Sequence, residues 1–281
     1  MLNISRSEVE FARANGINIA YQTFGDKDAS PLILIMGLGS QMVLWDGEFC
    51  RQLAAGGYRV IRFDNRDIGL STKLDWMQVP DSAAVASALQ RGEVPALPYT
   101  LEDMAADTAE LLKALGYDWA HIVGESMGGM IGQIMAIHFP ERLRSLTSIM
   151  SSTGNPLLPP PSPEVLEILY TPFPPDHDGY VESFVRAFKI LSGPAMPLNE
   201  TLARKWAEQT YKRGLNPAGV ARQFAAIMAA GDRTEKLKSI SVPTLVIHGE
   251  ADPLLPVECG LATAAAIPGS RLKIIPGMGH A

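Results

Sequence analysis

The sequence predicts an α/β protein, with a mostly parallel sheet that is flanked by helices and interrupted by a helical insertion. Apolar runs that suit strands buried on both faces alternate with helical segments, which is typical of a parallel sheet covered on both sides. A proline-rich stretch after Asn155 breaks this alternation, and it resumes at Pro243. The 281 residues suffice for one core domain with an inserted subdomain.

The predicted sheet begins with an antiparallel hairpin. Residues 9–13 and 17–21 flank an Asn15-Gly16 pair, which is a strong hairpin signal between alternating segments. Later strands are expected at residues 32–36, 58–63, 120–123, 143–150, 244–247 and 272–275. Helices are expected at residues 48–55, 100–116 and 127–138, the second of them with a capping box of Thr100 and Asp103.

The insertion divides the chain into two predicted domains. The core comprises residues 1–154 and 234–281, and residues 155–233 form the cap. Several prolines from Pro156 to Pro163 exclude a continuous helix or a central strand there. Amphipathic helices are predicted to follow at residues 180–191, 201–213 and 218–230.

Composition narrows the class of protein. With 47% apolar and 19% charged residues the chain is a globular protein, and its net charge of −6 argues against nucleic-acid binding. Cys50 and Cys259 give no disulfide framework and are expected to be buried thiols. No signal peptide and no membrane span are predicted, so we expect a cytoplasmic protein.

The motif with the clearest chemistry is Gly-Glu-Ser-Met-Gly at residues 124–128, between a predicted strand and a predicted helix. In that context Gly-x-Ser-x-Gly predicts a nucleophilic serine, Ser126, on a sharp turn. Gly124 and Gly128 are expected because such a turn leaves no room for side chains two positions away. The turn holds the hydroxyl at a helix N-terminus, where free N–H groups stabilise a developing oxyanion.

A serine nucleophile needs a base, and His280 is the predicted one among five histidines. It lies in a glycine loop after the last strand, at the sheet edge where α/β proteins collect their ligands, and the chain order Ser, Asp, His is the expected one. His121, His138 and His248 border strands or helices and are interpreted as structural. His177 lies in the insertion.

The predicted acid that orients this base is Asp252, which follows the strand at residues 244–247. Glu250 is the alternative in the same loop, and a plain role for Asp252 in the turn before a helix also stays open. The predicted oxyanion donors are the backbone N–H groups of Leu38, in the Met36-Gly37-Leu38-Gly39 loop, and Met127.

These motifs resemble the α/β-hydrolase family over nearly the whole chain. Residues 64–71, 138–143 and 242–249 are also similar to family segments. The resemblance implies that the insertion forms a cap over the active site and that Asp64 and Arg66 hold the turn and the loops near it. The nearest subgroup resembles bacterial carboxylesterases and the methylesterases of aromatic polyketide biosynthesis.

Two features depart from the family pattern. The loop after the first buried strand usually begins His-Gly in the family, whereas here it begins Met36-Gly37, so a side chain that braces the loop is missing. Family members usually continue from the catalytic histidine into a final helix, and here the sequence reaches Ala281 directly after His280.

We therefore predict hydrolysis of a small-molecule carboxylic ester, with an apolar acyl or alcohol part, through an acyl-enzyme. No metal, nucleotide or organic cofactor is expected, because no corresponding motif is present. The same triad also serves thioesters, amides, carbon–carbon bonds, perhydrolysis and cyanohydrin lysis, and a ligand receptor without turnover stays an alternative. The oligomeric state is open. Most apolar side chains of the insertion are expected to bury helix faces and a few to face the cleft: Leu157, Leu158, Phe173, Tyr180, Phe184, Phe188 and Trp206.

Overall fold

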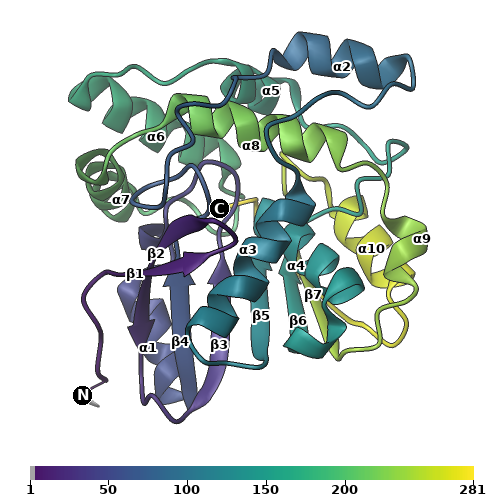
Figure 1. Cartoon of the computed structure of the whole chain (residues 1–281). Coiled ribbons are helices and arrows are strands. Elements are labelled where there is room, and N and C mark those ends of the chain that lie inside the picture. The colour runs from purple at the N-terminus through teal and green to yellow at the C-terminus, as the bar shows by residue number, and fades with distance from the viewer. Residues whose placement is uncertain (1–3) are drawn as a thin grey trace.

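A computed structural model describes residues 4–281, and its centre is one eight-stranded sheet (Figure 1). The strands are β1 (Glu10–Ala14), β2 (Ile17–Phe24), β3 (Ser30–Ile35), β4 (Tyr58–Phe63), β5 (Ala120–Glu125), β6 (Leu143–Ile149), β7 (Thr244–Gly249) and β8 (Arg271–Ile275). Their order in the sheet is β1-β2-β4-β3-β5-β6-β7-β8. From β4 to β8 every pairing is parallel, while β2 pairs antiparallel with β1 and β4, so the predicted fold class is confirmed.

The opening hairpin is the one predicted. Ala14 pairs with Ile17, so the loop has two residues, and both of them have positive φ angles, 44° at Asn15 and 82° at Gly16. This is the conformation of a type I′ turn, whose twist matches that of the strands it joins. β2 extends beyond the predicted residue 21 because its second half pairs with β4.

Alternation along the strands supplies two separate cores, one on each face of the sheet. In β3, Ile33 and Ile35 contribute to a large core with α3 (Leu101–Ala114) and α4 (Met127–His138), while Leu32 and Leu34 contribute to a smaller one with α1 (Gly47–Ala55). Successive strand side chains point to opposite faces, so a strand covered on both sides is apolar throughout. This explains the uninterrupted apolar run of β3.

The structure contains more helices than were predicted. The remaining helices are α2 (Ser82–Gln90), α5 (Pro163–Tyr170), α6 (His177–Leu191), α7 (Glu200–Arg213), α8 (Pro217–Ala229), α9 (Thr234–Leu237) and α10 (Val257–Ala266), with 3-10 turns η1 (Met42–Leu44) and η2 (Pro140–Arg142). The capping box of Thr100 and Asp103 is confirmed at the start of α3. Helices α2, α5 and α9 were not predicted, and a helix at the position of α10 was considered only as an alternative explanation for Asp252. Pro163 begins α5 rather than preventing a helix, because proline fits the first helical turn.

Helices α5 to α8 lie beyond the carboxyl ends of the parallel strands, and α2 lies with them against α8 (Figure 1). Tyr180, Phe184 and Ala207 form a buried cluster between α6 and α7, with Phe188 stacked on Phe184 at 4.3 Å between ring centroids. These aromatic side chains therefore pack mainly on one another. Leu157, in contrast, is 91% exposed.

In residues 4–281, no helix combines the length and the apolar character needed to cross a membrane. Cys50 and Cys259 are both buried and unpaired, as expected.

Candidate active site

Ser126 occupies a strained turn between β5 and α4. Its φ of 55° and ψ of −119° lie outside the regions that L-residues adopt freely, which costs about 1–3 kcal/mol and persists only where the surroundings enforce it. A Cβ on Gly124 would lie far inside contact distance of the Gly128 carbonyl oxygen, and a Cβ on Gly128 equally close to that of Ile35. Glycine is therefore required on both sides of Ser126.

The loop after β3 lies directly against this turn. A Cβ on Gly37 would lie 3.2 Å from the Ser126 Cβ, which is tighter than an ordinary contact, so glycine favours this close approach of the loop. Among the hydrogen bonds of residues 4–281, none is donated by the backbone N–H of Leu38 or of Met127. The two donors predicted for an oxyanion are thus unengaged beside Ser126.

Side chains from other elements brace the loop after β3 in place of the missing histidine. Asn65 Nδ2 donates to the Met36 carbonyl at 3.0 Å. The backbone N–H of Gly39 donates to Gln223 Oε1, in helix α8, also at 3.0 Å. Sequence reasoning missed Gln223, because nothing local links it to a loop 184 positions away.

The structure brings His280 and Asp252 together at the carboxyl ends of β7 and β8. His280 Nδ1 lies 2.7 Å from Asp252 Oδ2, and both residues are buried. The backbone N–H groups of Leu254 and Leu255 donate to Asp252 Oδ1 at 2.9 and 2.8 Å. With Nδ1 engaged as the donor, the second ring nitrogen of His280 is left to act as an acceptor.

Electrostatics keep this carboxylate ionised. Burial alone would raise the pKa of Asp252, but contacts with His248 and His280 and the backbone donor at Leu255 outweigh it and lower the pKa to about 2. Burial raises the pKa of the neighbouring Glu125. Ser126 Oγ makes no hydrogen bond to another described residue, so its contact with His280 is not formed in this conformation. Such contacts are often loose without substrate.

His248 lies closer to the site than its interpretation as structural suggests. Its Nε2 lies 2.7 Å from the Leu255 carbonyl oxygen and 3.4 Å from Asp252 Oδ2. Gly260 leaves room for the ring, since a Cβ there would lie 2.6 Å from it. The signal in the sequence was the four-residue spacing between His248 and Asp252 around the glycine turn.

In residues 4–281, the remaining histidines and Glu250 form no hydrogen bond with the side chains of His280 and Asp252. His121 Nδ1 contacts Ser145 Oγ at 2.8 Å, His138 ends α4, and His177 begins α6 and contacts Asp178 at 2.7 Å. Glu250 Oε2 accepts a hydrogen bond from the Gly277 N–H at 3.0 Å rather than from His280. Of the two carboxylates considered for the acid, Asp252 is therefore the one in contact with the histidine.

The turn after β4 is joined to helices α7 and α8 by two ion pairs. Arg222 of α8 forms a doubly hydrogen-bonded pair with Asp67 at 2.8 and 2.9 Å, and both side chains are buried. Arg213 of α7 pairs with Asp64, whose carboxylate also accepts from the Met42 and Leu70 N–H groups. The resemblance implied that Asp64 holds nearby loops, and these contacts agree with that role and extend it to helix α7.

Comparison with known proteins decides the family. The model of the alpha/beta hydrolase fold family matches residues 30–281. The chain belongs to the alpha/beta hydrolase fold family.

Similar alpha/beta hydrolases include two curated methylesterases and a solved structure. Rhodomycin D methylesterase DnrP of Streptomyces peucetius is 30% identical, and the alignment covers 92% of this chain and 87% of that protein. Rhodomycin D methylesterase DauP of Streptomyces sp. (strain C5) is 31% identical, and the alignment again covers 92% of this chain and 87% of that protein. The crystal structure of a hydrolase from Pseudomonas aeruginosa PA01 has a TM-score of 0.69 and 27% identity, covering 98% of this chain and 92% of that one.

Proposed function

We propose that this hydrolase cleaves carboxylic esters through a Ser126–His280–Asp252 triad and an acyl-enzyme intermediate. The observation that carries the proposal is the hydrogen bond between His280 Nδ1 and the ionised Asp252, which leaves the other imidazole nitrogen as a base. The unengaged N–H groups of Leu38 and Met127 beside Ser126 support it, as do the methylesterase names of two relatives.

In the proposed reaction His280 takes the proton of Ser126 while the hydroxyl oxygen attacks the ester carbonyl carbon. The tetrahedral oxyanion is stabilised by the N–H groups of Leu38 and Met127. His280 then returns the proton to the departing alcohol. Water, deprotonated by His280, then attacks the acyl-enzyme. As the bond to Ser126 Oγ breaks and the carboxylic acid is released, His280 returns the proton to Ser126 Oγ.

The proposed substrate is a small ester with an apolar acyl or alcohol part. Core loops supply the triad and the oxyanion donors, so groups that distinguish acyl chains have to come largely from residues 155–233, the proposed cap. This division into cap and core is itself part of the proposal. An apolar pocket with few polar groups is the usual form of a small-molecule site.

A fluorophosphonate probe and a panel of esters test the proposal. We expect the probe to label the wild-type chain but not Ser126→Ala, and the variant to lose on the order of 10⁶ in kcat while its circular dichroism is unchanged. p-Nitrophenyl esters of increasing chain length, methyl esters and a thioester define the substrate class. A folded wild-type chain that neither reacts with the probe nor releases alcohol would instead be a ligand receptor.

A further inference from the structure

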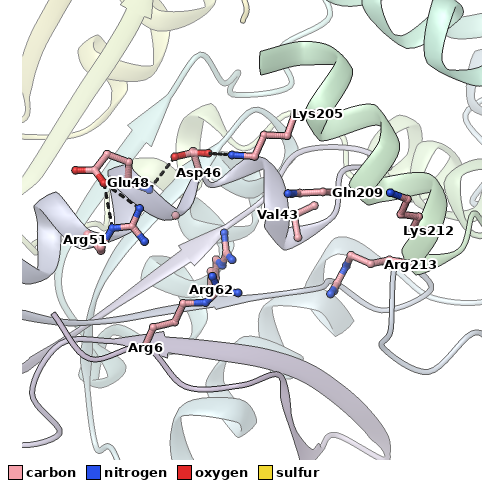
Figure 2. A pocket seen from close by; sticks show the side chains of 11 residues that line it. Arg6, Val43, Asp46, Glu48, Arg51, Arg62, Lys205, Gln209, Lys212 and Arg213 are labelled. Carbon is pink, nitrogen blue, oxygen red and sulfur yellow. Dashed lines mark hydrogen bonds and ion pairs between the residues drawn. The ribbon is translucent and has the colours of Figure 1, made fainter. Parts of the chain in front are cut away.

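A cleft of about 350 Å³ lies between cap helix α7 and the core, apart from the candidate active site. Figure 2 shows its walls, formed by the start of α1, the end of β4, Arg6 and one face of α7. Ser126, Asp252 and His280 are not among its lining residues. The proposed hydrolysis therefore leaves this cleft without a role.

The lining is strongly cationic in a protein whose net charge is −6. Six cationic side chains meet two anionic ones, Asp46 and Glu48. Both anions already have cationic partners at the rim, Lys205 at 4.0 Å and Arg51 at 2.9 Å. Such a concentration of one charge sign in a concave site attracts ions of the opposite sign.

Three of the cations have no such partner. Within the part of the chain that the structure describes, Arg6, Arg62 and Lys212 form no ion pair with a carboxylate, whereas Arg213 pairs with Asp64. Positive charge thus stays uncompensated on the core side of the cleft, at Arg62, and on the cap side, at Lys212.

Among these cations, Arg62 has the greatest need of a counter-ion because it is only 4% exposed. Its guanidinium donates to neutral acceptors, Gln22 Oε1 and the Trp45 carbonyl oxygen, and lies 5.1 Å from the Phe24 ring centroid. Burial lowers the pKa of Arg62. A buried charge without a counter-ion is unfavourable, and an anion in the adjoining cleft would supply one.

We propose that this cleft binds a small oxyanion with at least two negative charges, such as a phosphate ester or a di- or tricarboxylate. Val43 contributes the one aliphatic side chain of the lining, so an extended apolar ligand would find little to contact. Arginine forks match the oxygen pairs of both phosphate and carboxylate groups. Because the lining includes both α7 and α1, the bound anion joins the cap to the core.

Isothermal titration calorimetry and thermal unfolding test this site with pyrophosphate and citrate as probes. Sodium chloride at matched ionic strength and acetate are the controls. We expect binding of one or both probes, weakened by added salt, and a rise of roughly 2–4 °C in Tm at tenfold excess over Kd. The stronger of the two probes identifies whether phosphate or carboxylate groups are preferred.

Two matched double variants distinguish specific binding in the cleft from nonspecific attraction of anions to positive charge on the protein. Lys205→Gln with Lys212→Gln removes two exposed cations of the cleft, and we expect roughly tenfold weaker binding. Lys27→Gln with Lys236→Gln removes two exposed lysines outside it and should bind as the wild type does. The proposal would be overturned if both double variants lost binding equally or both retained it equally. It would also be overturned if neither probe gave heat at millimolar concentration, or if sodium chloride raised Tm by the same amount.

Discussion

Asp252→Asn is the substitution that tests the proposed triad most directly. The two backbone N–H groups of Leu254 and Leu255 donate to Oδ1, so the amide oxygen of an asparagine takes that position. Its NH₂ group then replaces Oδ2 and faces His280 Nδ1, where a donor now meets a donor. To keep a hydrogen bond, His280 has to move its proton to Nε2, and in that tautomer it cannot accept the proton of Ser126.

The expected loss of kcat is about 10⁴-fold, by analogy with the same substitution in serine proteases, and smaller than that for Ser126→Ala. Stability changes as well. The native pKa of Asp252 is lowered from 3.8 to about 2. At about 1.4 kcal/mol per unit, the carboxylate contributes on the order of 2 kcal/mol to the free energy of unfolding at neutral pH.

This contribution has a defined pH window. A lowered native pKa gives stability that is complete well above pH 3.8 and is lost as the pH falls toward 2. The difference in unfolding free energy between the wild type and Asp252→Asn should therefore shrink to about half of its neutral value near pH 3.

The assay combines ester hydrolysis at pH 7 with urea unfolding from pH 7 to pH 3. Glu250→Gln is the matched control, since it makes the same chemical change two residues away on a carboxylate that contacts the Gly277 N–H. We expect this control to keep activity within about tenfold. If Glu250→Gln proved the more damaging of the two, or Asp252→Asn kept near-normal kcat, Asp252 would not be the acid.

Three further substitutions address the turn around Ser126, the loop after β3 and the attachment of helix α8. Gly128→Ala inserts a Cβ where β3 leaves no room, so activity should fall below detection and Tm should drop in a thermal scan. Gln223→Leu removes the acceptor of the Gly39 N–H. In steady-state kinetics it should lower kcat by about 10- to 100-fold with a smaller change in KM. An effect on KM alone would speak against a role of Gln223 in positioning the proposed oxyanion donors. Arg222→Met leaves Asp67 buried without its partner and should cost about 3–5 kcal/mol in urea unfolding, largely recovered by adding Asp67→Asn; no recovery would mean that the pair is not the cause.

The sequence predicts those parts of the molecule whose signals are local. The apolar run of β3, the Asn15-Gly16 turn and the capping box of α3 each depend on residues within a few positions, and each is confirmed. The contact between His280 and Asp252 could also be anticipated, because parallel strands bring their carboxyl ends to one edge. The catalytic roles assigned to these residues stay predictions.

What the sequence did not predict depends on contacts distant along the chain. Helix α2 is the exception, because its signal is local: Asp81 caps an alanine-rich segment. The partners Arg222 and Gln223 have no local signal, since they meet residues more than 150 positions away. From the sequence, the aromatic residues of α6 predict only that this helix has an apolar face. The packing of Tyr180 against aromatic side chains of α7 depends on how the two helices cross.

The turn after β4 connects helix α8 to the loop after β3. Asn65 holds the Met36 carbonyl on one side of the loop, while the Arg66 carbonyl accepts from the amide of Gln223, whose oxygen holds the Gly39 N–H on the other side. Helix α8 therefore cannot move away from the core without also releasing the Gly39 N–H. If the N–H groups of Leu38 and Met127 stabilise the oxyanion as proposed, displacement of α8 should reduce kcat even for substrates too small to contact α8. The histidine that is missing from this loop is thus replaced by hydrogen bonds from Asn65 and from Gln223 of α8.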